Sequence, residues 1–159
     1  MKSIDGLNIN VPDTVYIGID PGKSGAIAVL LDDGKIYVDN YDMGIKYLFD
    51  LLRLSAKYNH YCCIEKVHSF PGQGVASTFS FGKNYGIWVA MLESNNIRYT
   101  NPTPQAWIKH YIELGKYAKK ERKNKLKAIA QRLHPNTKVT LRNADAILLA
   151  HYAKATRND

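Results

Sequence analysis

The chain has 159 residues, of which 45% are hydrophobic and 23% charged, and its formal net charge is +8. This length and composition fit one globular domain with a sizeable core, and no segment is apolar for long enough to suggest a membrane span. We therefore expect no membrane partner and a cytoplasmic location, which the two adjacent cysteines, Cys62 and Cys63, also favour because neighbouring strand residues bridge poorly.

The first part of the chain predicts a short arm followed by three strands. Residues 1–14 are polar and form the expected N-terminal arm, and residues 15–159 form the predicted single domain. Three apolar segments follow the arm: residues 15–20, 25–31 and 35–39. The Asp-Asp-Gly at residues 32–34 is a strong hairpin signal, so we expect these segments to form an antiparallel meander.

The rest of the chain alternates helical and strand patterns. The predicted helices are residues 45–58, 76–94, 104–111, 121–133 and 144–155, and the predicted strands are residues 61–65 and 97–100. Because a helix precedes the strand at 61–65, this strand should run parallel to an earlier one. Asn143 is the expected cap of the last helix. The pattern predicts an α/β fold, in which a mixed five-stranded sheet of meander and parallel strands is flanked by helices.

Three acidic residues stand at the ends of these elements. Asp20 ends the first strand, Glu65 ends the fourth, and Asp145 lies in the first turn of the last helix. If the first and fourth strands are parallel neighbours, Asp20 and Glu65 emerge at one sheet edge, where open α/β sheets bind ligands. Structural roles are the alternative, because Asp20 could stabilise a turn and Asp145 suits the helix dipole. Glu65 is harder to explain in this way, since an unpaired charge beside an apolar strand is costly to bury.

Converging carboxylates would favour metal binding. Two carboxylates ~5 Å apart repel by roughly 3 kcal/mol at an effective dielectric of about 20, so a cluster of three requires cations. Ligand sets made only of oxygen select Mg²⁺, with Mn²⁺ as a substitute. Two such ions suit hydrolysis of a phosphodiester, because one activates water and the other stabilises the leaving oxygen. No histidine base is then required, and the five histidines show no ligand spacing.

The positive charge is concentrated in one part of the chain. Residues 98–138 hold 11 Lys and Arg against 2 Asp and Glu, whereas residues 1–97 hold 8 against 10. One quarter of the chain therefore supplies the whole positive balance, which indicates a basic face and a polyanionic partner. A solvated, lysine-rich helix is the simpler alternative.

Three motifs, in order along the chain, carry a family resemblance. They are IGIDPG (17–22), IEKV (64–67) and ADAILLA (144–150). Over residues 15–152 the sequence resembles the RuvC-type Holliday junction resolvases of the RNase H-like superfamily. The resemblance implies an RNase H-like fold and a homodimeric, Mg²⁺-dependent endonuclease that resolves four-way DNA junctions by paired cuts. Asp20, Glu65 and Asp145 match three acidic ligands of that family, and the short chain with its polar arm is similar to phage-encoded members.

The fourth ligand of the family departs from the pattern. It is an Asp or His three residues before the last Asp, and here that position holds Arg142. The resemblance leaves Asn143 as the substitute oxygen ligand for the second of two ions. A family lysine near the start of the late basic helix assists at the scissile phosphate, and the spacing does not choose between Lys120, Lys123 and Lys125.

The resemblance also implies the surface that contacts DNA. The family's wedge aromatic directly follows the IEKV-like motif, where this chain has His68 and, slightly later, Phe70. The aromatic residues of the helix at 76–94 either form the dimer seam or pack on the sheet. The predicted DNA-binding residues are Lys23, Ser24, His68, Phe70, Lys116, Lys119, Lys120, Lys123, Lys125 and Lys127.

Two other functions remain open at this point, and a third is disfavoured by the length of the chain. An RNase H-like nuclease could act on forks or RNA–DNA hybrids, and Arg142 in place of an acid would also suit a catalytically inactive junction-binding module. The turn after Asp20 resembles the phosphate loop of actin-like ATPases. Those proteins need a second such domain, for which 159 residues leave no room. We therefore expect no nucleotide cofactor.

Overall fold

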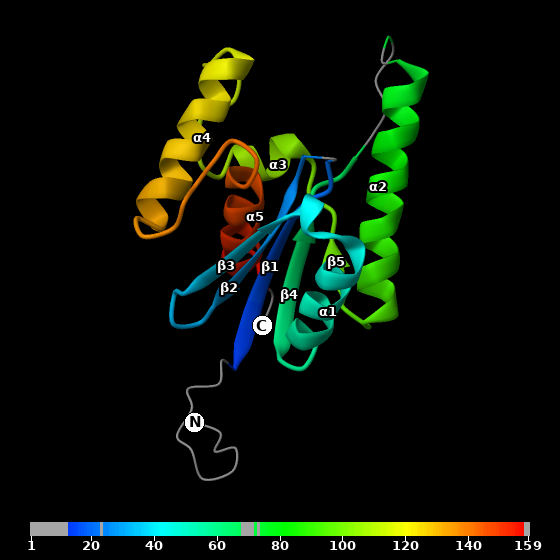
Figure 1. Ribbon diagram of the computed structural model, residues 1–159. Helices are drawn as coiled ribbons and strands as arrows, with labels where there is room; N and C mark the ends of the chain where they lie inside the picture. The colour runs from blue at the N-terminus through cyan, green and yellow to red at the C-terminus, as the bar shows by residue number, and fades with distance from the viewer. Residues whose placement is uncertain (1–12, 23, 68–71, 73, 158–159) are drawn as a thin grey trace.

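The computed structural model describes residues 13–22, 24–67, 72 and 74–157. Its centre is a five-stranded mixed sheet (Figure 1). The strands are β1 (Thr14–Asp20), β2 (Ala26–Leu31), β3 (Ile36–Asn40), β4 (Asn59–Ile64) and β5 (Tyr99–Thr100), in the order β3-β2-β1-β4-β5. Strand β2 pairs antiparallel with β1 and β3, whereas β4 is parallel to β1 and to β5. The predicted meander and the predicted parallel strand are both confirmed.

The pairing of β1 with β4 aligns the ends of the two strands. Ile19 lies opposite Ile64, and the backbone N–H of Glu65 donates to the carbonyl of Ile19 at 3.0 Å. Asp20 and Glu65 therefore leave the sheet at the same edge. Cys62 and Cys63 are both free and buried, and they pack on opposite faces of the sheet, as expected for neighbours in a strand.

Helices cover both faces of the sheet (Figure 1). They are α1 (Ile45–Ser55), α2 (Val75–Ser94), α3 (Pro104–Ile108), α4 (Lys119–Leu133) and α5 (Ala144–Ala155), with a 3-10 turn, η1 (Tyr41–Met43). Residues of α1 and α2 enter one core cluster, and residues of α3, α4 and α5 enter the other. Within the described ranges, no helix is long and apolar enough to cross a membrane.

Most helix boundaries match the sequence pattern, but α1 and α3 each end three residues earlier than predicted. Thr103 caps the start of α3 by accepting a hydrogen bond from the backbone N–H of Ala106 at 3.2 Å, as expected of Thr-Pro. The helix ends at Ile108 instead of continuing to residue 111. The N–H groups of His110 and Tyr111 bond to carbonyls three residues back, which tightens the chain into turns.

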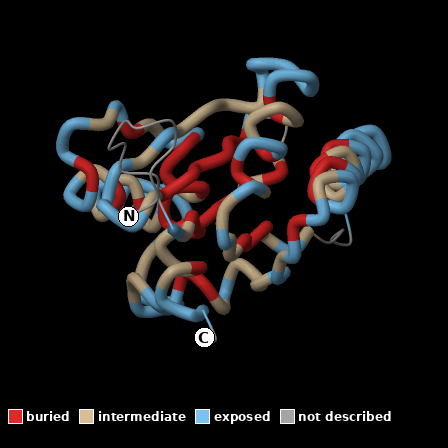
Figure 2. The backbone as a smooth tube through the Cα atoms, turned by 90° about the horizontal axis from the view of Figure 1, so that it is seen from below, coloured by how far each residue is buried: buried red, intermediate tan, exposed pale blue. Residues whose placement is uncertain are grey.

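Helix α5 packs directly on the backbone of β1. A Cβ atom at Gly18 would collide with the backbone oxygen of Ala146 and the backbone nitrogen of Ala150, so only glycine permits this approach. Figure 2 shows the buried segments gathered at the centre, while α2 stands to one side with its outer surface exposed. The close packing brings the first turn of α5, which carries Asp145, to the end of β1.

Candidate active site

The structure brings Asp20, Glu65 and Asp145 together at the edge where β1 and β4 end. Asp20 is the last residue of β1, Glu65 directly follows β4, and Asp145 is in the first turn of α5. Each side chain is partly buried. The charge of Asp20 raises the pKa of both other carboxyl groups, which reflects how near the three groups are to one another. The predicted convergence of strand ends thus places all three acids at one site.

Burial and mutual repulsion disfavour the ionised forms of these acids. Loss of hydration is the largest cause, and with the neighbouring carboxylates it raises the pKa of Glu65 to about 7 and that of Asp145 to about 6. Burial also raises the pKa of Asp20. Among the described residues, none of the ion pairs includes any of these three carboxylates. The described part of the chain therefore supplies no directly paired cation for the negative charge of the cluster.

Two hydrogen bonds orient the carboxylates. Oδ1 of Asp20 accepts from the backbone N–H of Gly22 at 3.0 Å, and Oε1 of Glu65 accepts from the indole N–H of Trp107 at 2.9 Å. Trp107 was not among the predicted site residues. No sequence pattern indicates its contact with Glu65, because the helix that carries Trp107 follows a different strand and the two residues are 42 positions apart.

Among the described lysines, Lys123 is the one whose charge favours the ionised forms of the three carboxylates. Its positive charge lowers the pKa of Asp20, Glu65 and Asp145 alike. Lys125 instead lies 4.4 Å from the ring centroid of Tyr117 and 3.9 Å from Glu121. Of the three candidates that the spacing left open, the structure therefore places Lys123 toward the acidic cluster.

The other described residues predicted to bind DNA lie in the turn after β1, in the loop before α4 and on α4. Ser24 is exposed in the turn after β1, Lys119 and Lys120 are exposed at the start of α4, and Lys127 is partly buried further along it. Lys116 lies in the loop before α4 and pairs with Glu113 at 3.2 Å. Three predicted residues lie outside the described residues: Lys23, His68 and Phe70.

Arg142 and Asn143 have structural partners in the loop before α5. The guanidinium of Arg142 donates to Asp42 Oδ2 at 3.0 Å and to the carbonyl of Ser24 at 3.4 Å. Oδ1 of Asn143 accepts from the N–H of Thr140 at 2.7 Å, and its amide donates to the carbonyl of Lys138 at 3.2 Å. Asn143 is the N-cap residue of α5, as predicted, but its side chain makes no cap hydrogen bond and turns back into the loop instead. The same bonds argue against Asn143 as a metal ligand.

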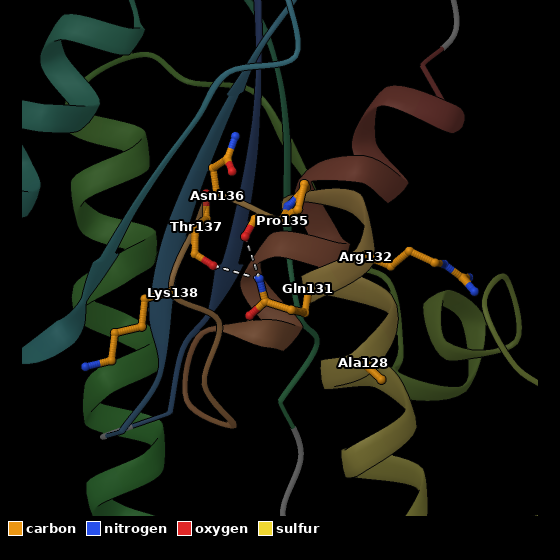
Figure 3. A pocket seen from close by; sticks show the side chains of 7 residues that line it. All are labelled: Ala128, Gln131, Arg132, Pro135, Asn136, Thr137 and Lys138. Atoms are coloured by element: carbon orange, nitrogen blue, oxygen red, sulfur yellow. Dashed lines mark hydrogen bonds between the residues drawn. The ribbon is translucent and has the colours of Figure 1, made fainter.

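A groove at the C-terminal end of α4 is separate from this site (Figure 3). The amide of Gln131 holds the loop there by donating to the carbonyls of His134, Pro135 and Thr137. Arg132 and Lys138 also line the groove, whereas none of the three carboxylates does. This groove is therefore not part of the candidate active site.

The fold is similar to that of solved Holliday junction resolvases. No protein-family model matches the sequence, and no curated protein matches it. The structure of Thermus thermophilus RuvC is similar with a TM-score of 0.51 and 14% identity, covering 89% of this chain and 95% of that one. T. thermophilus RuvC in complex with Holliday junction substrate gives the same TM-score and identity, covering 89% and 94%. The chain thus has a RuvC-like fold, consistent with the RNase H-like class expected from its motifs.

Proposed function

We propose that this chain is a structure-selective DNA endonuclease that resolves four-way junctions by paired, metal-dependent hydrolysis of phosphodiesters. The observation that carries the proposal is the convergence of Asp20, Glu65 and Asp145 without an ion-pair partner among the described residues, with Lys123 acting on all three. A RuvC-like fold supports the substrate, because one similar structure is a complex with a Holliday junction.

The donor set fits two Mg²⁺ or Mn²⁺ ions. Its three side chains offer only carboxylate oxygens, which suit hard divalent cations. Within the described residues, no three His, Cys, Asp or Glu side chains are already gathered tightly enough to hold an ion. Asp20, Glu65 and Asp145 would therefore adjust their side chains to hold the ions. When bound, the ions supply Lewis-acid activation of water and of the leaving oxygen.

The basic residues of α4 give the site its substrate surface. Lys123, whose charge lowers the pKa of Asp20, would face the scissile phosphate, and Lys119 and Lys120 would extend the positive surface along the exposed start of the helix. Contacts of this kind position a DNA backbone without reading its sequence. Selectivity for a branched substrate would then come from shape, with paired sites on two copies of the chain.

Cleavage of labelled substrates tests the proposed function. With Mg²⁺ we expect nicks in two opposed strands of a four-way junction, weaker cutting of a fork or an RNA–DNA hybrid, and no cutting in EDTA. Mn²⁺ should replace Mg²⁺. Preferred cutting of the fork or the hybrid would favour the alternative nuclease, whereas tight junction binding without nicks in either metal would indicate an inactive binding module.

We also propose that the chain forms a homodimer through the outer face of α2. Phe79 is 73% exposed and Val75 86% exposed on this helix, and Gly82 and Gly86 have open space where a Cβ would lie. Trp88, by contrast, is 0% exposed and packs in the core. The aromatic residues that the sequence left unassigned are therefore divided between the core and the surface.

Sedimentation of a Phe79→Glu variant tests the dimer. A charge in an apolar seam is costly to bury unpaired, so the variant should sediment as a monomer where the wild type sediments as a dimer. Tyr37→Glu is the matched control, because Tyr37 is 56% exposed on β3 and should leave the dimer intact. A monomeric wild type at micromolar concentration would contradict the proposal.

A further inference from the structure

Trp107 is buried next to the acidic cluster and contacts one of its members, Glu65. It is 1% exposed, and its indole N–H donates to Oε1 of Glu65 at 2.9 Å. Within the part of the chain that the structure describes, this is the one hydrogen bond to the Glu65 carboxylate. The contact joins residues that are 42 positions apart in the sequence, so it is made only by the folded protein.

One ring contact and two hydrogen bonds connect the segments that carry Trp107 and Glu65. The ring of Tyr111 meets that of Trp107 nearly edge-on, with centroids 6.3 Å apart, and the Tyr111 hydroxyl donates to the carbonyl of Leu148 in α5 at 2.6 Å. The backbone N–H of Lys66 donates to the carbonyl of Pro102, which ties the end of β4 to the segment that leads into α3. These bonds link the Trp107–Glu65 pair to the helix that carries Asp145.

An indole N–H is suited to orient a metal-binding carboxylate. It is a neutral donor with no acceptor capacity, so it can fix one oxygen of Glu65 without supplying a positive charge that would compete with a cation. Carboxylates that bind metals are usually hydrogen-bonded by such partners, and losing the partner typically weakens metal binding by about 10- to 100-fold.

We propose that Trp107 is a positioning residue that holds Oε1 of Glu65, so that the other oxygen would be available to an ion that Asp20 and Asp145 would also bind. The proposal rests on the proposed metal-dependent function. Lys123, which also acts on Glu65, lies on α4 and is exposed, so it cannot replace the buried donor behind the carboxylate.

The chain provides a matched control in its other tryptophan. Trp88 is 0% exposed, and its indole nitrogen is buried without a hydrogen-bond partner among the described residues. It packs in the core on the opposite face of the sheet. Trp88→Phe and Trp107→Phe therefore remove equally buried indoles, but only the second substitution breaks a bond to the candidate site.

Binding of Mn²⁺ to the full chain, followed by electron paramagnetic resonance of the free ion, tests the proposal. We expect Trp107→Phe to weaken binding by about tenfold or more relative to Trp88→Phe. In a Glu65→Gln background, Trp107→Phe should cause no further loss. If the two tryptophan variants bind Mn²⁺ with equal affinity and the wild type binds it normally, the positioning role of Trp107 is wrong and the metal-dependent function stands. Absence of Mn²⁺ binding by the wild type would overturn the metal-dependent function, and the positioning role with it.

Indole N–H signals in nuclear magnetic resonance spectra give a readout that does not require the Trp107→Phe variant to fold. The wild type should show two such signals. Mg²⁺ should shift the Trp107 signal and not the Trp88 signal, and Glu65→Ala without metal should also move the Trp107 signal alone. A Trp107 signal that ignores both changes would overturn the proposal.

Discussion

Substitution of Asp145 by Asn is expected to abolish cleavage of a four-way junction while leaving junction binding intact. The change keeps the size of the side chain and removes one of three carboxylates at the sheet edge. Lewis-acid stabilisation by bound ions is worth several kcal/mol, and about 1.4 kcal/mol corresponds to tenfold in rate, so we expect a loss of roughly 10³-fold or more. Asp20→Asn and Glu65→Gln should act in the same direction.

Binding should survive because the basic surface of α4 is untouched, and removal of a negative charge from the site reduces repulsion of the DNA backbone. Asp50→Asn is the matched control, since Asp50 is a carboxylate of α1 that pairs with Lys46 and Arg53. Single-turnover cleavage and a gel-shift assay on the same junction measure the two effects. An Asp145→Asn variant that retains a tenth or more of wild-type cleavage would contradict the metal assignment.

Glu65→Gln should make the metal-free protein more stable than the wild type at about pH 8, although the same variant loses activity. The folded-state pKa of Glu65 lies at about 7, above its ordinary value of 4.5. Its contribution to stability is therefore fully present below the ordinary value and is lost as the pH rises through about 7. At about 1.4 kcal/mol per pKa unit, the full effect is roughly 3 kcal/mol.

Urea unfolding of both proteins in EDTA, at about pH 5 and about pH 8, measures this effect. The difference between the two free energies of unfolding should be small at the lower pH and large at the higher one. His134 and His151, whose pKa values burial lowers, titrate in both proteins and cancel in the difference. Mg²⁺ should restore the stability of the wild type at the higher pH and have a smaller effect on Glu65→Gln. If Glu65→Gln is less stable than the wild type in EDTA at about pH 8, the ionised Glu65 carboxylate does not destabilise the metal-free protein, and the prediction is wrong.

The acidic cluster could be predicted because it follows from topology. A helix between two strands makes them parallel, and parallel neighbours bring their C-terminal ends to one edge, so the positions of Asp20 and Glu65 in the sequence were sufficient. The choice among the lysines could not be predicted. Successive residues of a helix point about 100° apart, and which one faces the carboxylates depends on how α4 docks.

Two contacts between distant segments and one competition within a loop account for the features that were not predicted. The histidines showed no ligand spacing, yet Nε2 of His134 and Nε2 of His151 lie 2.8 Å apart, where α4 meets α5. Asn143 carried a standard cap signal, but backbone groups of its own loop compete for the side chain. The role of Arg142 depends on Asp42, which is 100 residues away in the sequence. Such pairings leave no periodic pattern to read.

The contact at Gly18 has a consequence for how this site can evolve. Since α5 rests on the main chain of β1, the separation of Asp20 and Asp145 is set by backbone atoms, which every sequence shares. Core side chains elsewhere can then change without moving the two ligands relative to each other. A protein built in this way can change many of its core side chains and still keep the geometry between the first strand and the last helix. We expect substitutions at Gly18 to be far less tolerated than substitutions among the apolar residues around it.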